Sequence, residues 1–342
     1  MKNRWFSLVL LLTMSMVLAA CGANSNGAAG NNSAEAVAEA AAASPENAEV
    51  SVAAEAAEAP AEAAELTIKH ELGETTVKKN PQTVVVFDFG VLDSLDKLGV
   101  SVAGVPQANI PPYLSKYEGA EYANVGGLKE PDLEQISELQ PDLILISGRQ
   151  SDYYEDLSEI GPTVYMGVDT ERYMESYQEN AAKLGEIFGK EAEVTTELDS
   201  VSASIGTLKD KVTAEGKNAL IILANDGSIS AYGSGSRFGI IHDVFGFKQA
   251  DENIEATTHG QSVSFEYVAE KNPDYLFVID RGAAISTGEP ASKELIENDL
   301  VKGTNAYKNG KIVYLDPSYW YLSGGGLLSV EAMVEEVSAA VE

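Results

Sequence analysis

The sequence predicts an α/β protein with two lobes, one long helix that joins them, and a ligand cleft between the lobes. The first observation is an amphipathic stretch at residues 190–215, whose apolar side chains recur every three or four positions: Val194, Leu198, Val201, Ile205, Leu208 and Val212. A helix of this length spans roughly 35 Å, about the diameter of a small domain. The second observation is that predicted strands and helices alternate on both sides of this stretch, as in βαβ layers. The third is a repeated module.

The repeated module places a glutamate, a Pro-Asp pair and an arginine at equal spacing in each predicted lobe. Glu134 and Glu266 each lie seven residues before the proline of the pair, and Arg149 and Arg281 each lie eight residues after it. A short helix is predicted before each proline, and the apolar runs LILIS and YLFVID after it predict buried parallel strands. Open α/β sheets bind ligands at the carboxyl ends of their strands. We therefore expect both arginines to lie at the ligand site.

The N-terminus has the pattern of an export signal. Lys2 and Arg4 precede an apolar run that ends in Leu-Ala-Ala-Cys at Cys21, so residues 1–20 resemble a bacterial lipoprotein signal peptide. Such a signal is cleaved before the cysteine, whose sulfur receives the lipid. Cys21 is the only cysteine, which excludes a disulfide within the molecule. We expect an extracytoplasmic protein, anchored to the bacterial cell membrane by its lipid.

Composition divides the rest of the chain. Residues 21–65 are rich in Ala and Glu and carry no Lys or Arg, which indicates a tether that cannot bury a core. The remaining residues are predicted to form a first lobe at 66–189, the linking helix at 190–215 and a second lobe at 216–342. The formal net charge of the whole chain is −30, which argues against nucleic acid as a partner.

Catalytic signatures are missing from the sequence. It contains no GxxxxGK[ST], HExxH or GxSxG motif, and its one cysteine is assigned to lipidation. The loop GSGSRFG lacks the lysine of a phosphate-binding loop, and we expect it to orient Arg237. The sequence therefore predicts a binding protein rather than an enzyme.

Five segments together carry a family resemblance: ISGRQ at 146–150, GSRFG at 235–239, TTHGQ at 257–261, IDR at 279–281 and DPSYWYLSGGG at 316–326. With them the chain resembles the substrate-binding lipoproteins of ABC transporters for ferric siderophores, which form the helical-backbone class of periplasmic binding proteins. Within that family it is most similar to receptors for catecholate siderophores of the petrobactin type. The resemblance implies a monomer without a permanently bound cofactor, which captures a ferric siderophore and delivers it to an ABC permease.

The resemblance also implies roles for charged residues. A catecholate complex of ferric iron is anionic and presents rigid oxygen edges, which guanidinium groups match with paired donors. Arg149, Arg237 and Arg281 are expected to line the pocket. Glu134 and Glu266 are expected to dock on permease arginines, one from each lobe. The alternative for these glutamates is a helix-start position favoured by the macrodipole, and both interpretations remain open.

His259 and Tyr321 are candidate ligands of the siderophore-bound iron. A siderophore with two catecholates leaves two iron positions free, and imidazole and phenolate can fill them. The resembling family uses a His and a Tyr in this way. Tyr319 would point to the same side as Tyr321 if YWY were extended, so either tyrosine could be the ligand. Trp320 lies between them and is expected in the site.

Other cargoes remain possible within the same fold. Haem, cobalamin or a hydroxamate siderophore are alternatives, and a purely structural surface lipoprotein is a second alternative. A receptor for a bare metal ion needs several converging His and carboxylate side chains, and the chain has only three histidines. We expect His70 and His242 to be structural or surface residues. With the long helix as the only expected covalent link, lobe closure should be modest.

Overall fold

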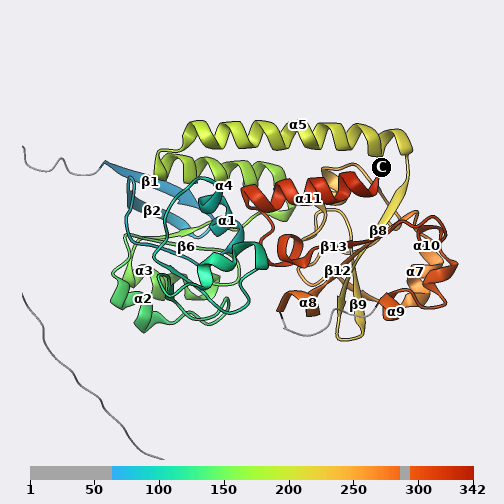
Figure 1. Ribbon diagram of the computed structural model, residues 1–342, viewed down its shortest axis with the longest axis horizontal. Helices are drawn as coiled ribbons and strands as arrows, with labels where there is room; N and C mark the ends of the chain where they lie inside the picture. Colours follow the sequence, from blue (N-terminus) through green and yellow to red (C-terminus); the bar gives the residue numbers. More distant parts are fainter. Residues whose placement is uncertain (1–63, 286–292) are drawn as a thin grey trace, which may run out of the picture. The chain divides into compact units, whose positions relative to one another are not determined.

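The computed structural model describes residues 64–285 and 293–342. The predicted signal peptide, Cys21 and all but the last two residues of the predicted tether lie outside the described residues. Within the described part, no helix combines the length and apolar character needed to cross a membrane. The described residues contain one larger sheet in each lobe and a separate two-stranded sheet (Figure 1).

The first lobe is built on a parallel sheet with strand order β5-β4-β3-β6-β7. Its strands are β3 (Val84–Val86), β4 (Gly104–Val105), β5 (Ala123–Asn124), β6 (Leu143–Ile146) and β7 (Thr163–Tyr165). Its helices are α1 (Phe89–Lys97), α2 (Leu133–Leu139), α3 (Tyr154–Ile160) and α4 (Tyr173–Phe188), with short 3₁₀ turns at Pro112–Glu118, Ser151–Tyr153 and Thr170–Arg172. Before this sheet, β1 (Glu65–His70) and β2 (Gly73–Lys78) pair antiparallel as a hairpin.

The second lobe has a mixed sheet with strand order β11-β9-β8-β12-β13, and β10 pairs with the start of β8. Its strands are β8 (Asn218–Asn225), β9 (Ser228–Tyr232), β10 (Lys248–Gln249), β11 (Gln261–Val263), β12 (Tyr275–Asp280) and β13 (Ile312–Leu315). Its helices are α6 (Ile240–Asp243), α7 (Phe265–Lys271), α8 (Arg281–Ile285), α9 (Lys293–Ile296), α10 (Asn305–Lys308) and α11 (Leu327–Ala340), with a 3₁₀ turn at Val301–Gly303. Strand β9 is antiparallel because Asp226 and Gly227 both adopt positive φ, at 47° and 82°, and form a tight hairpin.

The repeated module has the same structure in both lobes. Helices α2 and α7 begin after capping side chains: Asp132 accepts a hydrogen bond from the backbone N–H of Gln135, and Ser264 from that of Tyr267. Both helices end at a left-handed residue, and both are followed by the Pro-Asp pair and a buried parallel strand.

The aspartate of each pair fixes the start of the neighbouring central strand. Asp142 Oδ2 accepts from the backbone N–H of Thr83 at 3.0 Å, just before β3. Asp274 Oδ2 accepts from the backbone N–H of Asn218 at 3.3 Å, at the start of β8. The matched Pro-Asp pairs are therefore explained by strand anchoring.

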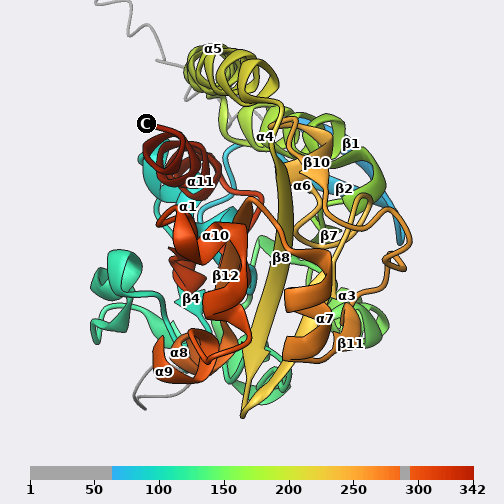
Figure 2. The same cartoon turned by 90° about the vertical axis from the view of Figure 1, so that its right-hand side faces the viewer.

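Helix α5 (Glu191–Glu215) runs alongside both lobes (Figure 1). It contacts α4 and α11, and the end-on view in Figure 2 shows the three helices next to one another. Five of its six predicted apolar positions are buried, and Leu198 is partly buried. Its buried stripe belongs to one continuous hydrophobic cluster with residues of both lobes.

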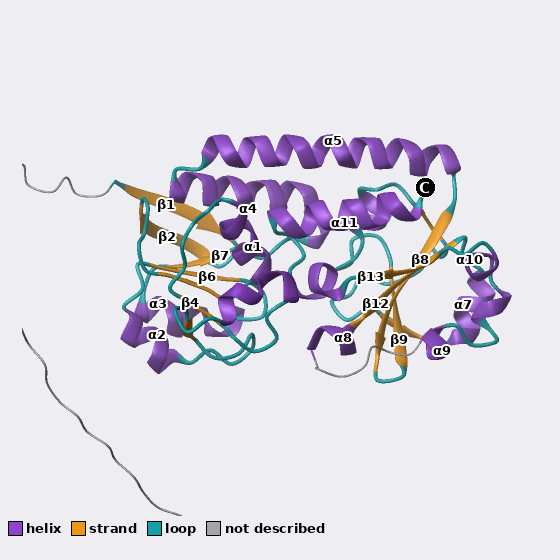
Figure 3. Cartoon of the chain, in the orientation of Figure 1, coloured by secondary structure: helices purple, strands orange, loops and turns teal. Residues whose placement is uncertain are grey.

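A second contact between the lobes was not expected from the sequence. After β13 the chain forms the π-helical turn η5 (Ser318–Leu322) and then α11, which packs on α1 of the first lobe as well as on α5 (Figures 2 and 3). The lobes are therefore also held together by the non-covalent packing of α11 on α1, in addition to the covalent link through the long helix. Helix α11 packs against the first lobe because its apolar residues are buried in that shared cluster. These residues include Val330, Met333, Val334 and Val337.

Candidate ligand-binding site

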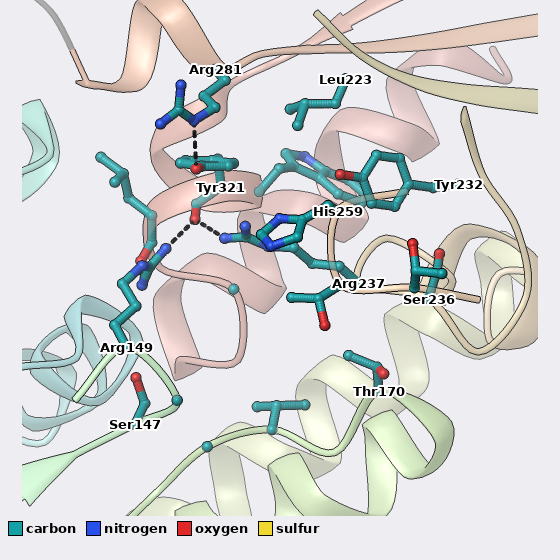
Figure 4. A pocket seen from close by; sticks show the side chains of 18 of the residues that line it. Ser147, Arg149, Thr170, Leu223, Tyr232, Ser236, Arg237, His259, Arg281 and Tyr321 are labelled. Carbon is teal, nitrogen blue, oxygen red and sulfur yellow. Dashed lines mark hydrogen bonds between the residues drawn. The ribbon is translucent and has the colours of Figure 1, made fainter. Parts of the chain in front are cut away.

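A large pocket of about 1330 Å³ lies at the carboxyl ends of strands from both sheets (Figure 4). In the first lobe its walls follow strands β3, β6 and β7, and include Asp88, Ser147, Arg149 and Thr170. In the second lobe they include Asn225 at the end of β8, Arg281 after β12, Arg237 in the loop after β9 and His259 in the loop before β11. Turn η5 contributes Trp320, Tyr321 and Leu322. This position is the one that open α/β sheets use for ligands.

The three predicted arginines converge on a single residue, Tyr321. Arg149 Nη2 donates to the backbone carbonyl of Tyr321 at 2.8 Å, and Arg237 Nη2 donates to the same carbonyl oxygen (Figure 4). Arg281 Nε donates to the Tyr321 hydroxyl at 2.9 Å, and its Nη1 donates to Asn225 Oδ1 at 2.8 Å. The guanidinium carbon of Arg237 also lies 4.2 Å from the centre of the Tyr321 ring.

The electrostatics of this cluster are strongly positive. Burial of Tyr321 acts to raise its pKa, but the hydrogen bond from Arg281 and the charges of Arg237, Arg281 and Arg149 outweigh burial, so the pKa lies below its usual value. Burial, followed by the charge of Arg149, lowers the pKa of Arg237. A guanidinium group remains charged even so. The pocket therefore favours an anion at Tyr321.

The YWY segment is not extended, which corrects one expectation. In the π-helical turn η5, Tyr321 faces the arginines while Tyr319 packs on Tyr113, with ring centres 4.7 Å apart. Tyr319 is not among the pocket-lining residues, whereas Trp320 and Tyr321 are. Trp320 is buried, and its indole N–H donates to Glu336 at 2.6 Å. The structure thus separates the two tyrosines that the sequence could not distinguish.

His259 lies on an exposed loop at the pocket wall, on the same pocket as Tyr321. The next residue, Gly260, has φ 70°, and a Cβ there would lie 2.7 Å from the ring of Tyr232. Glycine therefore lets this loop approach the pocket wall closely. The other two histidines are away from the pocket. His70 bonds to Thr75, and the buried His242 bonds to the carbonyl of Phe247.

Glu134 and Glu266 occupy matched surface positions. Each lies in the first turn of its helix, α2 or α7, and each is exposed. A hydrogen bond from Ser264 lowers the pKa of Glu266. Neither glutamate lines the pocket. The docking role of this pair stays a prediction.

Several pocket residues were not singled out from the sequence. Asn225, at the end of β8, fixes the guanidinium of Arg281, and Tyr232 and Lys129 add further polar atoms to the wall. Asn225 could have been found because it ends the apolar run ALIILAN, as Arg281 follows YLFVID. Among residues 64–285 and 293–342, no group of three or more His, Cys, Asp or Glu side chains could hold a metal ion.

Comparisons with known proteins identify relatives over most of the chain. A family model described as periplasmic binding protein matches residues 84–319. The petrobactin-binding protein YclQ of Bacillus subtilis is 56% identical over 281 residues, which cover 81% of this chain and 88% of YclQ. The ferric-anguibactin-binding protein FatB of Vibrio anguillarum is 32% identical over 276 residues, which cover 79% of this chain and 85% of FatB.

Solved structures agree with the fold. The crystal structure of YclQ superposes with a TM-score of 0.79 at 54% identity, covering 82% of this chain and 99% of YclQ. The periplasmic catecholate-siderophore binding protein VctP of Vibrio cholerae superposes with a TM-score of 0.77 at 36% identity, covering 81% of this chain and 100% of VctP. The predicted α/β fold of two lobes with a long helix is thereby confirmed.

Proposed function

The chain belongs to the periplasmic binding protein family, a family of transport proteins rather than enzymes, and from this premise we propose that it captures a ferric catecholate siderophore and delivers it to an ABC permease. The observation that carries the proposal is the convergence of Arg149, Arg237 and Arg281 on Tyr321 in one pocket. Charged planar donors at that point suit the oxygen edges of an anionic catecholate complex. The names of YclQ and VctP support the same cargo class.

We further propose that His259 and Tyr321 bind the iron of the captured complex directly. The ferric ion is cargo, and a bis-catecholate leaves positions on it that imidazole and phenolate can fill. The lowered pKa of Tyr321 supports this role, because the anionic phenolate is the better ligand for a hard cation. Trp320 belongs to the same turn and would report on ligand capture. The position of Tyr319 against Tyr113 argues for Tyr321 as the tyrosine ligand.

The cellular setting of the proposal has two parts, a membrane anchor and a contact with the permease. Cys21 would carry the lipid that holds a monomer at the outer face of the cell membrane; the Bacillus subtilis relatives YhfQ and YfiY, each 26% identical, are named as lipoproteins. Glu134 and Glu266 would contact the permease, one from each lobe. Their exposure and matched helix-start positions support such a pseudo-symmetric contact.

Ligand retention tests the proposed cargo. The chain from Cys21 onwards would be mixed with a ferric bis-catecholate, haem, cobalamin or a ferric hydroxamate, and passed through an ultrafilter that holds back protein. We expect stoichiometric retention of the coloured catecholate complex alone. Retention of haem, cobalamin or hydroxamate in its place would overturn the cargo and leave the fold intact. Passage of every ligand would favour a structural surface protein.

A further inference from the structure

Asp93 has a fully buried carboxyl group that joins α1 of the first lobe to the start of α11. Its relative exposure is 0%. Its Oδ1 accepts from the backbone N–H of Leu328 at 3.2 Å, and its Oδ2 from that of Ser329 at 3.1 Å. The neighbouring Ser94 Oγ accepts from the backbone N–H of Leu327 at 2.9 Å. Three free N–H groups at the start of α11 are thus satisfied by side chains of α1.

The contact between these segments leaves no room for adjustment. A Cβ on Gly326 would lie 1.9 Å from Asp93 Oδ1 and 2.2 Å from the carbonyl oxygen of Gly90. A Cβ on Gly90 would lie 2.5 Å from the carbonyl oxygen of Ser323. Backbone therefore meets backbone here, and the segment that follows η5 has one position relative to α1.

A second contact leads from Asp93 to η5 itself. Tyr113, in the first-lobe turn at Pro112–Glu118, donates its hydroxyl hydrogen to Asp93 Oδ2 at 3.0 Å. The ring of Tyr113 packs on that of Tyr319, within η5. Asp93 thus reaches η5 from both ends: through Tyr113 and Tyr319 at its start, and through the backbone of residues 323–329 after it.

Both contacts hold η5, which contains Tyr321, the residue on which the three arginines converge. The carbonyl oxygen of Tyr321 accepts from Arg149 of the first lobe and Arg237 of the second. The hydroxyl accepts from Arg281. We propose that Asp93 is a positioning residue for the ligand pocket: by capping α11 and holding Tyr113, it fixes η5 where three arginines from both lobes converge.

The position of η5 matters because the hydrogen bonds between the arginines and Tyr321 tolerate only small displacements. Hydrogen bonds weaken steeply beyond about 3.2 Å, and binding sites need their groups held within about 0.5 Å. A small displacement of η5 would release Arg149 or Arg237 from the shared carbonyl and move Tyr321 together with Trp320. In its bearing on ligand affinity, this inference rests on the proposed function.

The test compares four variants of the chain from Cys21 onwards. Asp93→Ala removes every acceptor, and Asp93→Asn keeps the shape and one carbonyl oxygen. Tyr113→Leu removes the ring that packs on Tyr319, while Val337→Ala weakens the buried face of α11 without touching Asp93 or η5. We expect the Kd for a ferric bis-catecholate to rise at least about tenfold in Asp93→Ala and several-fold in Tyr113→Leu, with Asp93→Asn recovering most of the affinity.

The control separates positioning from stability. Val337→Ala should lower the melting temperature and leave Kd within about twofold, since cavity formation alone does not move η5. If Asp93→Ala fails to fold, the Kd values of Tyr113→Leu and Asp93→Asn test the inference instead. Unchanged affinity in Asp93→Ala, or in Tyr113→Leu when Asp93→Ala does not fold, would overturn the inference.

A second readout needs no ligand. Trp320 is 2% exposed and is the only tryptophan after Trp5, so acrylamide quenching of its fluorescence reports on η5 alone. Asp93→Ala and Tyr113→Leu should increase quenching, and Val337→Ala should not. If the parent binds no catecholate, the proposed function fails, and this readout still decides the role of Asp93. Equal quenching in all variants would contradict the role.

Discussion

At the scale of single residues, the pocket chemistry rests on guanidinium groups that share one tyrosine. Arg149 follows strand β6, Arg281 follows strand β12, and Arg237 lies in the loop after β9. All three nevertheless donate to atoms of Tyr321. Hydrogen bonds that involve a charged group contribute about 1.5–3 kcal/mol. Removing one guanidinium should therefore change ligand affinity measurably.

Arg281→Ala is the cleanest of these substitutions. It should raise the Kd for a ferric bis-catecholate by about tenfold to a hundredfold, because one charged donor pair is lost. Lys217→Ala removes a positive charge at the opposite end of β8, where Lys217 pairs with Asp274, and should leave Kd unchanged. Titration calorimetry of the two variants checks this. Parent-like affinity in a folded Arg281→Ala protein would remove Arg281 from the pocket.

Asp93 gives a pH dependence of stability with a definite sign. Burial, only partly offset by the hydrogen bonds of Ser329 and Tyr113, raises its pKa to about 8. The folded protein therefore holds a proton that the unfolded chain releases near its ordinary pKa of 3.8. This contribution to stability is complete below the unfolded pKa and is lost as pH rises toward 8.

The comparison of the parent with Asp93→Asn isolates that contribution. The melting temperature of the parent minus that of the variant should fall between pH 5 and pH 8.5. Burial also raises the pKa of the neighbouring Tyr113, Tyr173 and Tyr177, so these groups stay neutral over this range. A difference that stays constant or grows with pH, followed by circular dichroism, would contradict the assignment.

At the scale of elements, the joint between α1 and α11 holds the fold together. Gly326→Ala places a methyl group against Asp93 and the backbone of Gly90, and should destabilise the protein by about 1–3 kcal/mol through overpacking. Gly206, in the exposed interior of α5, has no atom within 4 Å of a new Cβ. Gly206→Ala should stabilise by about 0.5–1 kcal/mol. Urea unfolding of both proteins measures the contrast, and equal effects would argue against a tight joint.

Elements that are determined by a local sequence pattern were predictable from the sequence. The 3.6-residue period gave α5, and the matched Pro-Asp pairs predicted two helix-strand units whose arginines line one pocket. The π-helical turn η5 was not predictable. Its shape depends on hydrogen bonds that Arg149 and Arg237 donate from distant parts of the chain, and on the bond that the Trp320 indole N–H donates to Glu336.

The return of α11 to the first lobe was missed for a similar reason. The amphipathic pattern of residues 327–340 shows that one face is buried, but periodicity does not say which element covers it. Asp93 and Ser94 provide the partner groups, and they lie more than two hundred residues away in sequence.

At the scale of the whole described part, the long helix and the packing of α11 on α1 hold the lobes together. Helix α5 and the segment from η5 to α11 both pack on residues of one continuous cluster. Lobe closure on ligand capture should therefore be modest. Small-angle scattering with and without a ferric bis-catecholate should show little change in the radius of gyration. A change as large as in proteins hinged on flexible strands would contradict this expectation.

In the proposed function, a ferric catecholate is captured at Tyr321 with help from His259. Trp320 adjoins Tyr321 and is the only tryptophan in the chain from Cys21 onwards, so its fluorescence follows the site directly. The most direct measurement is a fluorescence titration with a ferric bis-catecholate, corrected for absorption by the ligand, on the parent and on His259→Ala. We expect saturable quenching in the parent and weaker binding in the variant. Absence of quenching in the parent, or equal affinity in both proteins, would contradict it.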